Sequence, residues 1–130
     1  MARYEHLPIY KRAFDLNLYF ENIVRHFSRY HKYTLGTELR VNARDVVQLI
    51  IKANNTVERI NILIELRDKL EKLKLILRLC KEVKAFNNFK SFHIAFNHVI
   101  DISKQNEGWI KSLSRPKHKN KKIRGHGQNF

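Results

Sequence analysis

The chain has 130 residues, 43% of them hydrophobic, and it carries a formal net charge of +14 at pH 7. This length predicts one domain, and the hydrophobic content excludes a chain that is disordered throughout. Glycine and proline are so scarce (four and two residues) that long helices are expected. An excess of positive charge this large favours a polyanionic partner such as DNA or RNA.

Apolar residues in the first part of the chain recur on one helical face. Their alternating steps of four and three residues are typical of an amphipathic helix. Proline is favoured at the first position of a helix, so Pro8 marks the start. The face is formed by Ile9, Ala13, Leu16, Phe20, Ile23, Phe27 and Tyr30. The pattern predicts one uninterrupted helix over residues 8–32.

A break at Gly36 separates this helix from a second one. Thr34 or Thr37 can cap the second helix, whose apolar face extends over residues 39–57. The turn-forming residues 54–56, Asn-Asn-Thr, predict its end. The same apolar phase continues beyond this turn, so the boundary with the next helix is the least defined one in the sequence.

The third predicted helix, over residues 61–86, is apolar around an unusually wide arc. One apolar stripe lies between Leu63 and Cys80, and a second lies between Ile62 and Val83. A helix with so wide an arc needs contacts on more than one side. It is therefore either the most buried helix of its own bundle or a helix that also contacts a second subunit. Cys80, the only cysteine, is predicted to be a buried thiol.

A second turn precedes a fourth helix over residues 89–112, and Asn88 is the predicted cap. Four helices joined by short connections predict an all-α fold, an up-down antiparallel four-helix bundle. We expect this bundle to occupy residues 1–113. Residues 114–130 lack apolar periodicity and are expected to form a basic, flexible C-terminal tail.

Motifs for catalysis, metals and cofactors are missing from the sequence. It has no GxxxxGK[ST] or GxGxxG loop, no HExxH and no CxxC, and its seven histidines are scattered. We therefore expect no catalytic residue, no metal site, no cofactor and no enzymatic activity. No apolar run approaches the ~18 residues that a membrane span requires, and the N-terminus lacks a secretory signal. The expected location is the cytoplasm, without membrane contact.

Basic residues form stripes at helical spacing late in the first predicted helix, early in the second and late in the third. Cations in such stripes and in the tail contact phosphates, although those near a helix end also stabilise the helix dipole. Tyr30, His31 and Tyr33 lie among them and either stack on unpaired bases or pack within the protein. The predicted nucleic-acid contacts are Arg25, Arg29, Lys32, Arg40, Arg44, Lys81, Lys84, Arg115, Lys117, Lys119, Lys121, Lys122 and Arg124.

Three segments resemble a known family. They are FSRYHKYTLGTELR (residues 27–40), LRLCKE (77–82) and SKQNEGW (103–109). The chain is similar over residues 5–113 to the accessory variability determinant proteins of diversity-generating retroelements. These belong with the four-helix-bundle proteins encoded in intervening sequences of bacterial ribosomal RNA. The YTLG segment is the more specific part of the resemblance.

The resemblance implies a bundle that assembles into a basic, pentameric barrel. It implies binding of DNA and RNA with little sequence preference, association with a reverse transcriptase, and a role in mutagenic retrohoming. Two alternatives stay open on the residues alone. One is an intervening-sequence protein that binds structured ribosomal RNA without a polymerase partner. The other is a scaffold bundle whose charge meets an acidic protein.

Overall fold

The computed structural model describes residues 3–114. Within this range the regular elements are all helical. They are η1 (Tyr4–His6), α1 (Pro8–Val24), α2 (Arg29–Tyr33), α3 (Leu35–Asn54), α4 (Ile60–Glu82) and α5 (Phe89–Ser114). The predicted all-α class is confirmed. The predicted tail residues 115–130 lie outside the described part of the chain.

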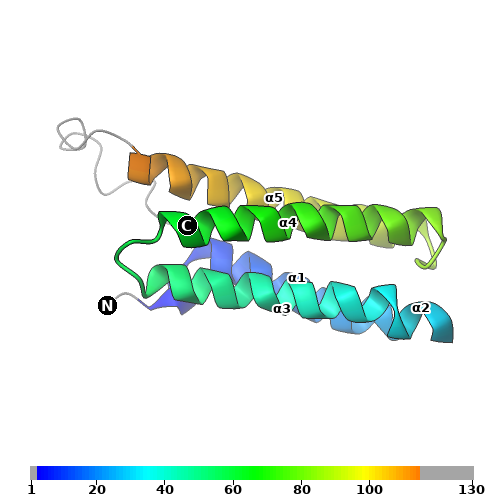
Figure 1. Cartoon of the computed structure of the whole chain (residues 1–130). Helices are drawn as coiled ribbons and strands as arrows, with labels where there is room; N and C mark the ends of the chain where they lie inside the picture. The colour runs from blue at the N-terminus through cyan, green and yellow to red at the C-terminus, as the bar shows by residue number, and fades with distance from the viewer. Residues whose placement is uncertain (1–2, 115–130) are drawn as a thin grey trace.

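The four long helices α1, α3, α4 and α5 form an antiparallel up-down bundle (Figure 1). Around the bundle each helix packs against two neighbours, in the order α1, α3, α4, α5 and back to α1. As a result α1 and α4 end at the same end of the bundle, where α3 and α5 begin. We call this end, formed by residues 25–38 and 81–90, the α2 end, because the short helix α2 lies there (Figure 1).

The prediction of one helix over residues 8–32 is wrong, because α1 ends at Val24. The N–H groups of His26 and Phe27 bond to carbonyls only three residues back, at 3.1 and 2.9 Å, which tightens the last turn. Ser28 then starts α2, and its Oγ accepts a bond from the N–H of His31 at 3.4 Å. A serine side chain that bonds to the backbone in this way competes with helix continuation.

Gly36 does not break the chain between helices but lies in the first turn of α3. A Cβ atom at Gly36 would lie 2.6 Å from Val24 Cγ1 and 3.0 Å from the carbonyl oxygen of His31. Glycine is therefore required here for close packing against the end of α1. Thr34 precedes α3 but makes no side-chain cap, since its Oγ1 donates to the carbonyl of Tyr30 at 2.8 Å. The predicted end of this helix in the Asn-Asn-Thr turn is confirmed, because Asn54 is the last residue of α3.

The third predicted helix is shorter than expected, since α4 ends at Glu82 and not at residue 86. Lys84 takes a left-handed backbone conformation with φ of +60°, and the N–H of Ala85 bonds back to the carbonyl of Cys80 at 2.8 Å. This is the hydrogen-bond pattern of a Schellman C-cap. Asn88 caps α5 as predicted, because its Oδ1 accepts from the N–H of Ser91 at 2.9 Å. α5 extends two residues past the predicted end, to Ser114.

The two apolar stripes of α4 have different environments. The stripe between Leu63 and Cys80 is buried in the bundle, and burial raises the pKa of the Cys80 thiol to about 12. On the other stripe Leu75, Leu79 and Val83 are about half exposed. The bundle alone therefore does not cover the whole apolar arc. None of the described helices combines the length and the hydropathy that crossing a bilayer demands.

Candidate nucleic-acid interface

Five of the predicted contact residues gather at the α2 end. Arg25 follows the last residue of α1, Arg29 and Lys32 lie in α2, and Lys81 and Lys84 lie at the end of α4. The turns that carry them touch each other, because the rings of Phe27 and Phe86 meet edge to face at 5.5 Å (ring centroids). Two sequence stripes about 50 residues apart thus form one basic surface.

Most of these cations have no acidic partner. Among the described residues, Arg29, Lys32 and Lys84 form no ion pair, and Arg25 bonds only to the Asn22 side chain, at 3.3 Å. Lys81 Nζ lies 4.0 Å from an oxygen of the neighbouring Glu82 carboxylate, which is largely exposed. An exposed ion pair of this kind is worth about 0–1 kcal/mol, so it hardly competes with a phosphate.

The other two predicted contacts on the helices lie elsewhere. Arg40 and Arg44 project from α3 toward α1, where their guanidinium groups lie 3.7 and 3.5 Å from one carboxylate oxygen of Glu21. Unlike Arg29, Lys32 and Lys84, these two arginines lie outside the segments of the α2 end and share an acidic partner. Glu21 on α1 partly offsets their charge. The spacing of residues along α3 could not reveal this pairing, because the acid lies on another helix.

The predicted tail contacts, residues 115–124, lie outside the described residues. Six of the 26 Lys and Arg residues and none of the 12 Asp and Glu residues fall after Ser114, so the remainder of the chain has a formal charge of +8. α5 starts at the α2 end, and Ser114, its last residue, lies at the opposite end of the bundle (Figure 1).

The aromatic residues of α2 do not belong to the core. Tyr30 and Tyr33 are 73% and 69% exposed, and His31 contacts Tyr30 edge to face at 5.4 Å. Of the alternatives to base stacking, burial in the core is wrong for both tyrosines, whereas packing within the turn agrees with the contact between Tyr30 and His31. Tyr30 lies between Arg29 and Lys32 in the sequence, Tyr33 follows Lys32, and both side chains are exposed to solvent.

Sequence reasoning missed a hollow at the turn between α4 and α5. Its volume is about 410 Å³, and its wall combines three aromatic rings with two lysines. The rings belong to Phe86, Phe89 and Phe92, and the lysines are Lys81 and Lys84. Their signal in the sequence is a pair of phenylalanines, Phe86 and Phe89, that flank the Asn-Asn turn shortly after Lys81 and Lys84.

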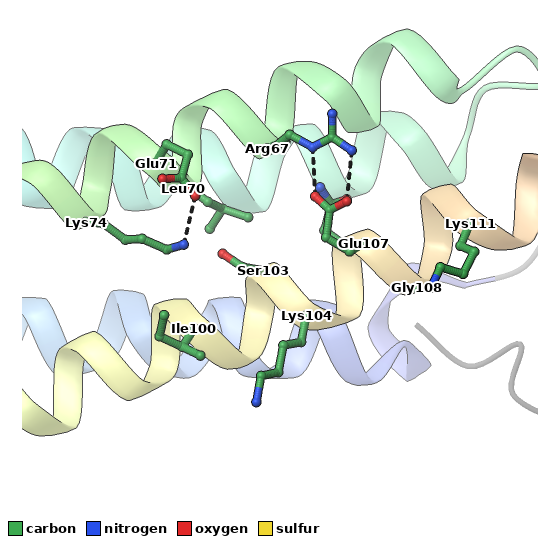
Figure 2. A pocket seen from close by; sticks show the side chains of 11 residues that line it. Arg67, Leu70, Glu71, Lys74, Ile100, Ser103, Lys104, Glu107, Gly108 and Lys111 are labelled. Atoms are coloured by element: carbon green, nitrogen blue, oxygen red, sulfur yellow. Dashed lines mark hydrogen bonds and ion pairs between the residues drawn. The ribbon is translucent and has the colours of Figure 1, made fainter.

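A second cavity, of about 490 Å³, lies between α4 and α5 (Figure 2). Arg67 donates from Nε and Nη2 to the two carboxylate oxygens of Glu107, both at 2.8 Å, and Lys74 pairs with Glu71 at 2.8 Å. The bond from Arg67 lowers the pKa of Glu107 and raises that of Arg67. Both groups stay charged near neutral pH, so the pair is not suited to proton transfer.

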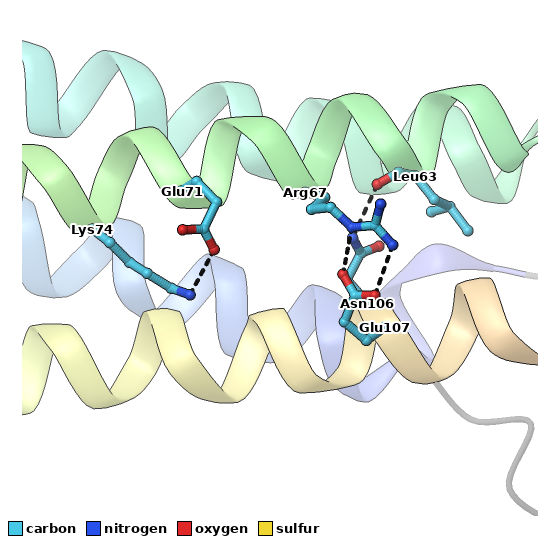
Figure 3. A network of polar contacts seen from close by, with 6 residues as sticks. All are labelled: Leu63, Arg67, Glu71, Lys74, Asn106 and Glu107. Carbon is cyan, nitrogen blue, oxygen red and sulfur yellow. Dashed lines mark hydrogen bonds and ion pairs between the residues drawn. The ribbon is translucent and has the colours of Figure 1, made fainter.

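The polar contacts around this cavity hold two helices together. In Figure 3 the Arg67–Glu107 pair lies beside Asn106, whose Nδ2 donates to the carbonyl of Leu63 at 3.0 Å. Asn106 is fully buried, so this bond joins α5 to the backbone of α4 inside the bundle. The arrangement ties α4 to α5 and is structural. Within residues 3–114, no three His, Cys, Asp or Glu side chains converge to hold a metal ion.

Comparisons with known proteins identify a family. A family model described as bAvd-like matches residues 7–113, which cover nearly all of the bundle. No curated protein matches the chain. The match spans the four long helices and both turns of the α2 end. The chain therefore belongs to the bAvd-like family.

Proposed function

We propose that this protein is a nucleic-acid-binding accessory protein of a diversity-generating retroelement. It binds RNA and DNA without sequence preference, associates with the reverse transcriptase and thereby supports mutagenic retrohoming. Membership of the bAvd-like family supports the accessory role. In this proposal the protein acts in the cytoplasm as a binding protein and catalyses no reaction itself.

The observation that carries the proposal is the set of unpaired cations at the α2 end. Arg25, Arg29 and Lys84 are exposed there, and only Glu38 and Glu82 carry negative charge within the segments that form this end. Contacts from lysine and arginine to phosphates release counterions and supply affinity that does not depend on sequence. The basic tail adds further phosphate contacts in this proposal.

Assembly into a homopentamer would multiply this charge, because each subunit contributes its own α2 end. The exposed apolar residues Leu75 and Leu79 on α4, and Phe14 and Leu18 on α1, support an oligomer. The number five follows from the family resemblance. Native mass spectrometry of the full chain gives the subunit number directly, and a monomer at micromolar concentration would contradict the oligomer.

Binding is tested by fluorescence anisotropy with duplex DNA and duplex RNA of unrelated sequences at several salt concentrations. If 6–10 phosphates are neutralised, affinity falls by about 10³–10⁵-fold between 50 and 200 mM salt. The variant Arg25→Ala/Arg29→Ala/Lys84→Ala should reduce the slope of log affinity against log salt by about 2–3. A salt response that stays flat for the unmodified chain would refute phosphate binding.

A matched control removes the same charge elsewhere. The variant Lys11→Ala/Lys72→Ala/Lys104→Ala also loses three exposed cations, each away from the α2 end. This control variant should bind nucleic acid more tightly than the variant Arg25→Ala/Arg29→Ala/Lys84→Ala. Equal losses in the two variants would show that total charge, and not this surface, determines binding.

The partner is tested by co-expression with a reverse transcriptase encoded beside this gene, followed by affinity purification and size-exclusion chromatography. Co-elution after nuclease treatment is expected for a direct complex. RNA binding without any reverse-transcriptase partner would instead favour the intervening-sequence function. If the protein neither forms a complex with the reverse transcriptase nor binds RNA, the scaffold function is favoured.

A further inference from the structure

The hollow at the α4–α5 turn has a chemistry that the proposed function does not require. Phosphate contacts need no aromatic ring, yet besides the core residues Phe86 and Phe92 its wall contains Phe89, which is 65% exposed. Its volume of about 410 Å³ falls within the range of small-ligand sites. The ring of Phe89 and the two lysines together suit a ligand that has both an apolar surface and a negative charge.

The aromatic part of the wall consists of two buried rings and one exposed ring. Phe86 and Phe92 are at least nine-tenths buried and contact each other with ring centroids 6.0 Å apart. Phe89, the first residue of α5, rests on Phe92 at 5.7 Å and on His93 at 6.0 Å, yet it is 65% exposed. An exposed ring fixed against other rings is suited to stacking.

The two lysines are placed at the same hollow. Lys81 Nζ lies over the ring of Phe92, 5.0 Å from its centroid, so its charge is held at the aromatic wall. Lys84 occupies the left-handed position of the C-cap, with φ of +60°. Glycine is favoured at that position on steric grounds, so the backbone conformation does not explain a lysine there. Asn88 starts α5 at the wall, and the helix N-terminus adds partial positive charge.

An acidic side chain or an apolar segment would contact only part of this wall. An acidic side chain would pair with the lysines but would leave the exposed ring of Phe89 without a partner. An apolar segment of a second subunit would cover the ring but would bury Lys81 and Lys84 without counter-charges, which is costly. A nucleotide with an unpaired base uses both, because the base stacks on the ring and the phosphate meets the lysines.

We infer that this hollow binds an unpaired nucleobase on Phe89 together with its phosphate on Lys81 and Lys84. Single-stranded RNA and single-stranded DNA are therefore the ligands that the α2 end prefers over duplexes. The inference rests on the proposed nucleic-acid binding and names its ligand class. Every base has an aromatic face, so the site is compatible with binding that ignores sequence.

The test uses the full chain and fluorescence anisotropy with four probes of about 20 nucleotides. They are single-stranded uridine RNA, single-stranded thymidine DNA, a duplex with the same number of phosphates, and an abasic single strand. The unmodified chain should bind the two single strands tightest, and their comparison distinguishes RNA from DNA. Binding to the abasic strand should be weaker, since that strand keeps the phosphates but lacks bases.

Variants at Phe89 separate stacking from apolar packing. Phe89→Leu should weaken binding to single strands by about 5-fold to 100-fold, with little change for the duplex and abasic probes. Phe89→Tyr keeps the aromatic face and should retain most of the affinity. Val57→Ala changes a residue that is 90% exposed at the opposite end of the bundle and should bind like the unmodified chain. Thermal melts by circular dichroism confirm that each variant folds.

The outcomes are distinct. Equal affinity for the normal and abasic strands, or unchanged binding by Phe89→Leu, would overturn this inference and leave the proposed function intact. Equal losses in Phe89→Leu and Phe89→Tyr would also overturn it, because stacking does not distinguish the two rings so strongly. Failure of the unmodified chain to bind any probe would refute the proposed function and the inference together.

Discussion

Phe27 and Phe86 meet edge to face, with ring centroids 5.5 Å apart, and join the turn after α1 to the turn after α4. Both are at least nine-tenths buried, although each lies in a segment between long helices. Antiparallel packing places Arg25 and Arg29 at the same end as Lys81, and this contact joins the turns that carry them. The two buried rings therefore pack beneath the turns that carry the basic surface.

Phe27→Ala should lower the free energy of unfolding by about 3–5 kcal/mol, because it leaves a cavity between the two turns. Urea denaturation followed by circular dichroism measures the change. The control Val57→Ala, at a position 90% exposed at the opposite end of the bundle, should cost about 0.5 kcal/mol or less. Comparable losses in both variants would show that the Phe27–Phe86 contact is not a special support of this end.

Gly36→Ala should destabilise the protein by about 1–3 kcal/mol, although alanine usually favours a helix. The added Cβ would lie 2.6 Å from Val24 Cγ1, so the end of α1 must move. Denaturation of the two single variants and of Gly36→Ala/Val24→Ala forms a double-mutant cycle. The cycle should show that Val24→Ala relieves part of the cost. Purely additive losses would argue against the close contact.

Lys84→Gly should raise the free energy of unfolding by about 1 kcal/mol, because glycine adopts positive φ without steric cost. We expect this gain in stability because Lys84 has a φ of +60°. Lys84→Ala removes the same charge but keeps the backbone strain, so its stability should stay within about 0.5 kcal/mol of the unmodified chain. Thermal melts of both variants test the difference. A loss of stability in Lys84→Gly would contradict a strained C-cap.

The His98 ring should make stability depend on pH. Burial lowers the pKa of His98 below its usual 6.5, with the nearby Arg12 adding to the shift and Asp15 and Asp101 opposing it. Below about pH 6.5 the unfolded chain therefore binds a proton that the folded chain does not. The stability contribution is fully present above pH 6.5 and is lost as pH falls through the lower pKa of the folded state.

His98→Phe provides the measurement for this pH effect. Phenylalanine does not titrate and keeps an aromatic ring against Tyr19, which stacks on His98 at 6.1 Å. Denaturant midpoints between about pH 5 and 7.5 should fall less steeply with acidification in this variant than in the unmodified chain. Identical pH profiles would mean that other groups cause the dependence.

Local patterns in the sequence were sufficient for the helices and for much of the core. Residues at steps of three and four, such as Ile9, Ala13 and Leu16, are buried in α1 as the periodicity requires. The Asn88 cap is also a local interaction, between residues three positions apart, and was predicted correctly. The end of α1 at Val24 was not predicted, because the apolar spacing continues through Phe27 while a serine cap redirects the backbone.

The helical class and the bundle follow from the periodicity of the sequence, the large positive charge follows from its composition, and the family resemblance follows from three short segments. Which cations share a surface depends instead on the packing of the helices. Lys81 and Lys84 join Arg25 because antiparallel packing places the ends of α1 and α4 together, whereas Arg44 shares a carboxylate with α1. The aromatic hollow beside them is lined by residues of one segment, 81–92, but its shape depends on how the C-cap of α4 and the start of α5 fold against each other.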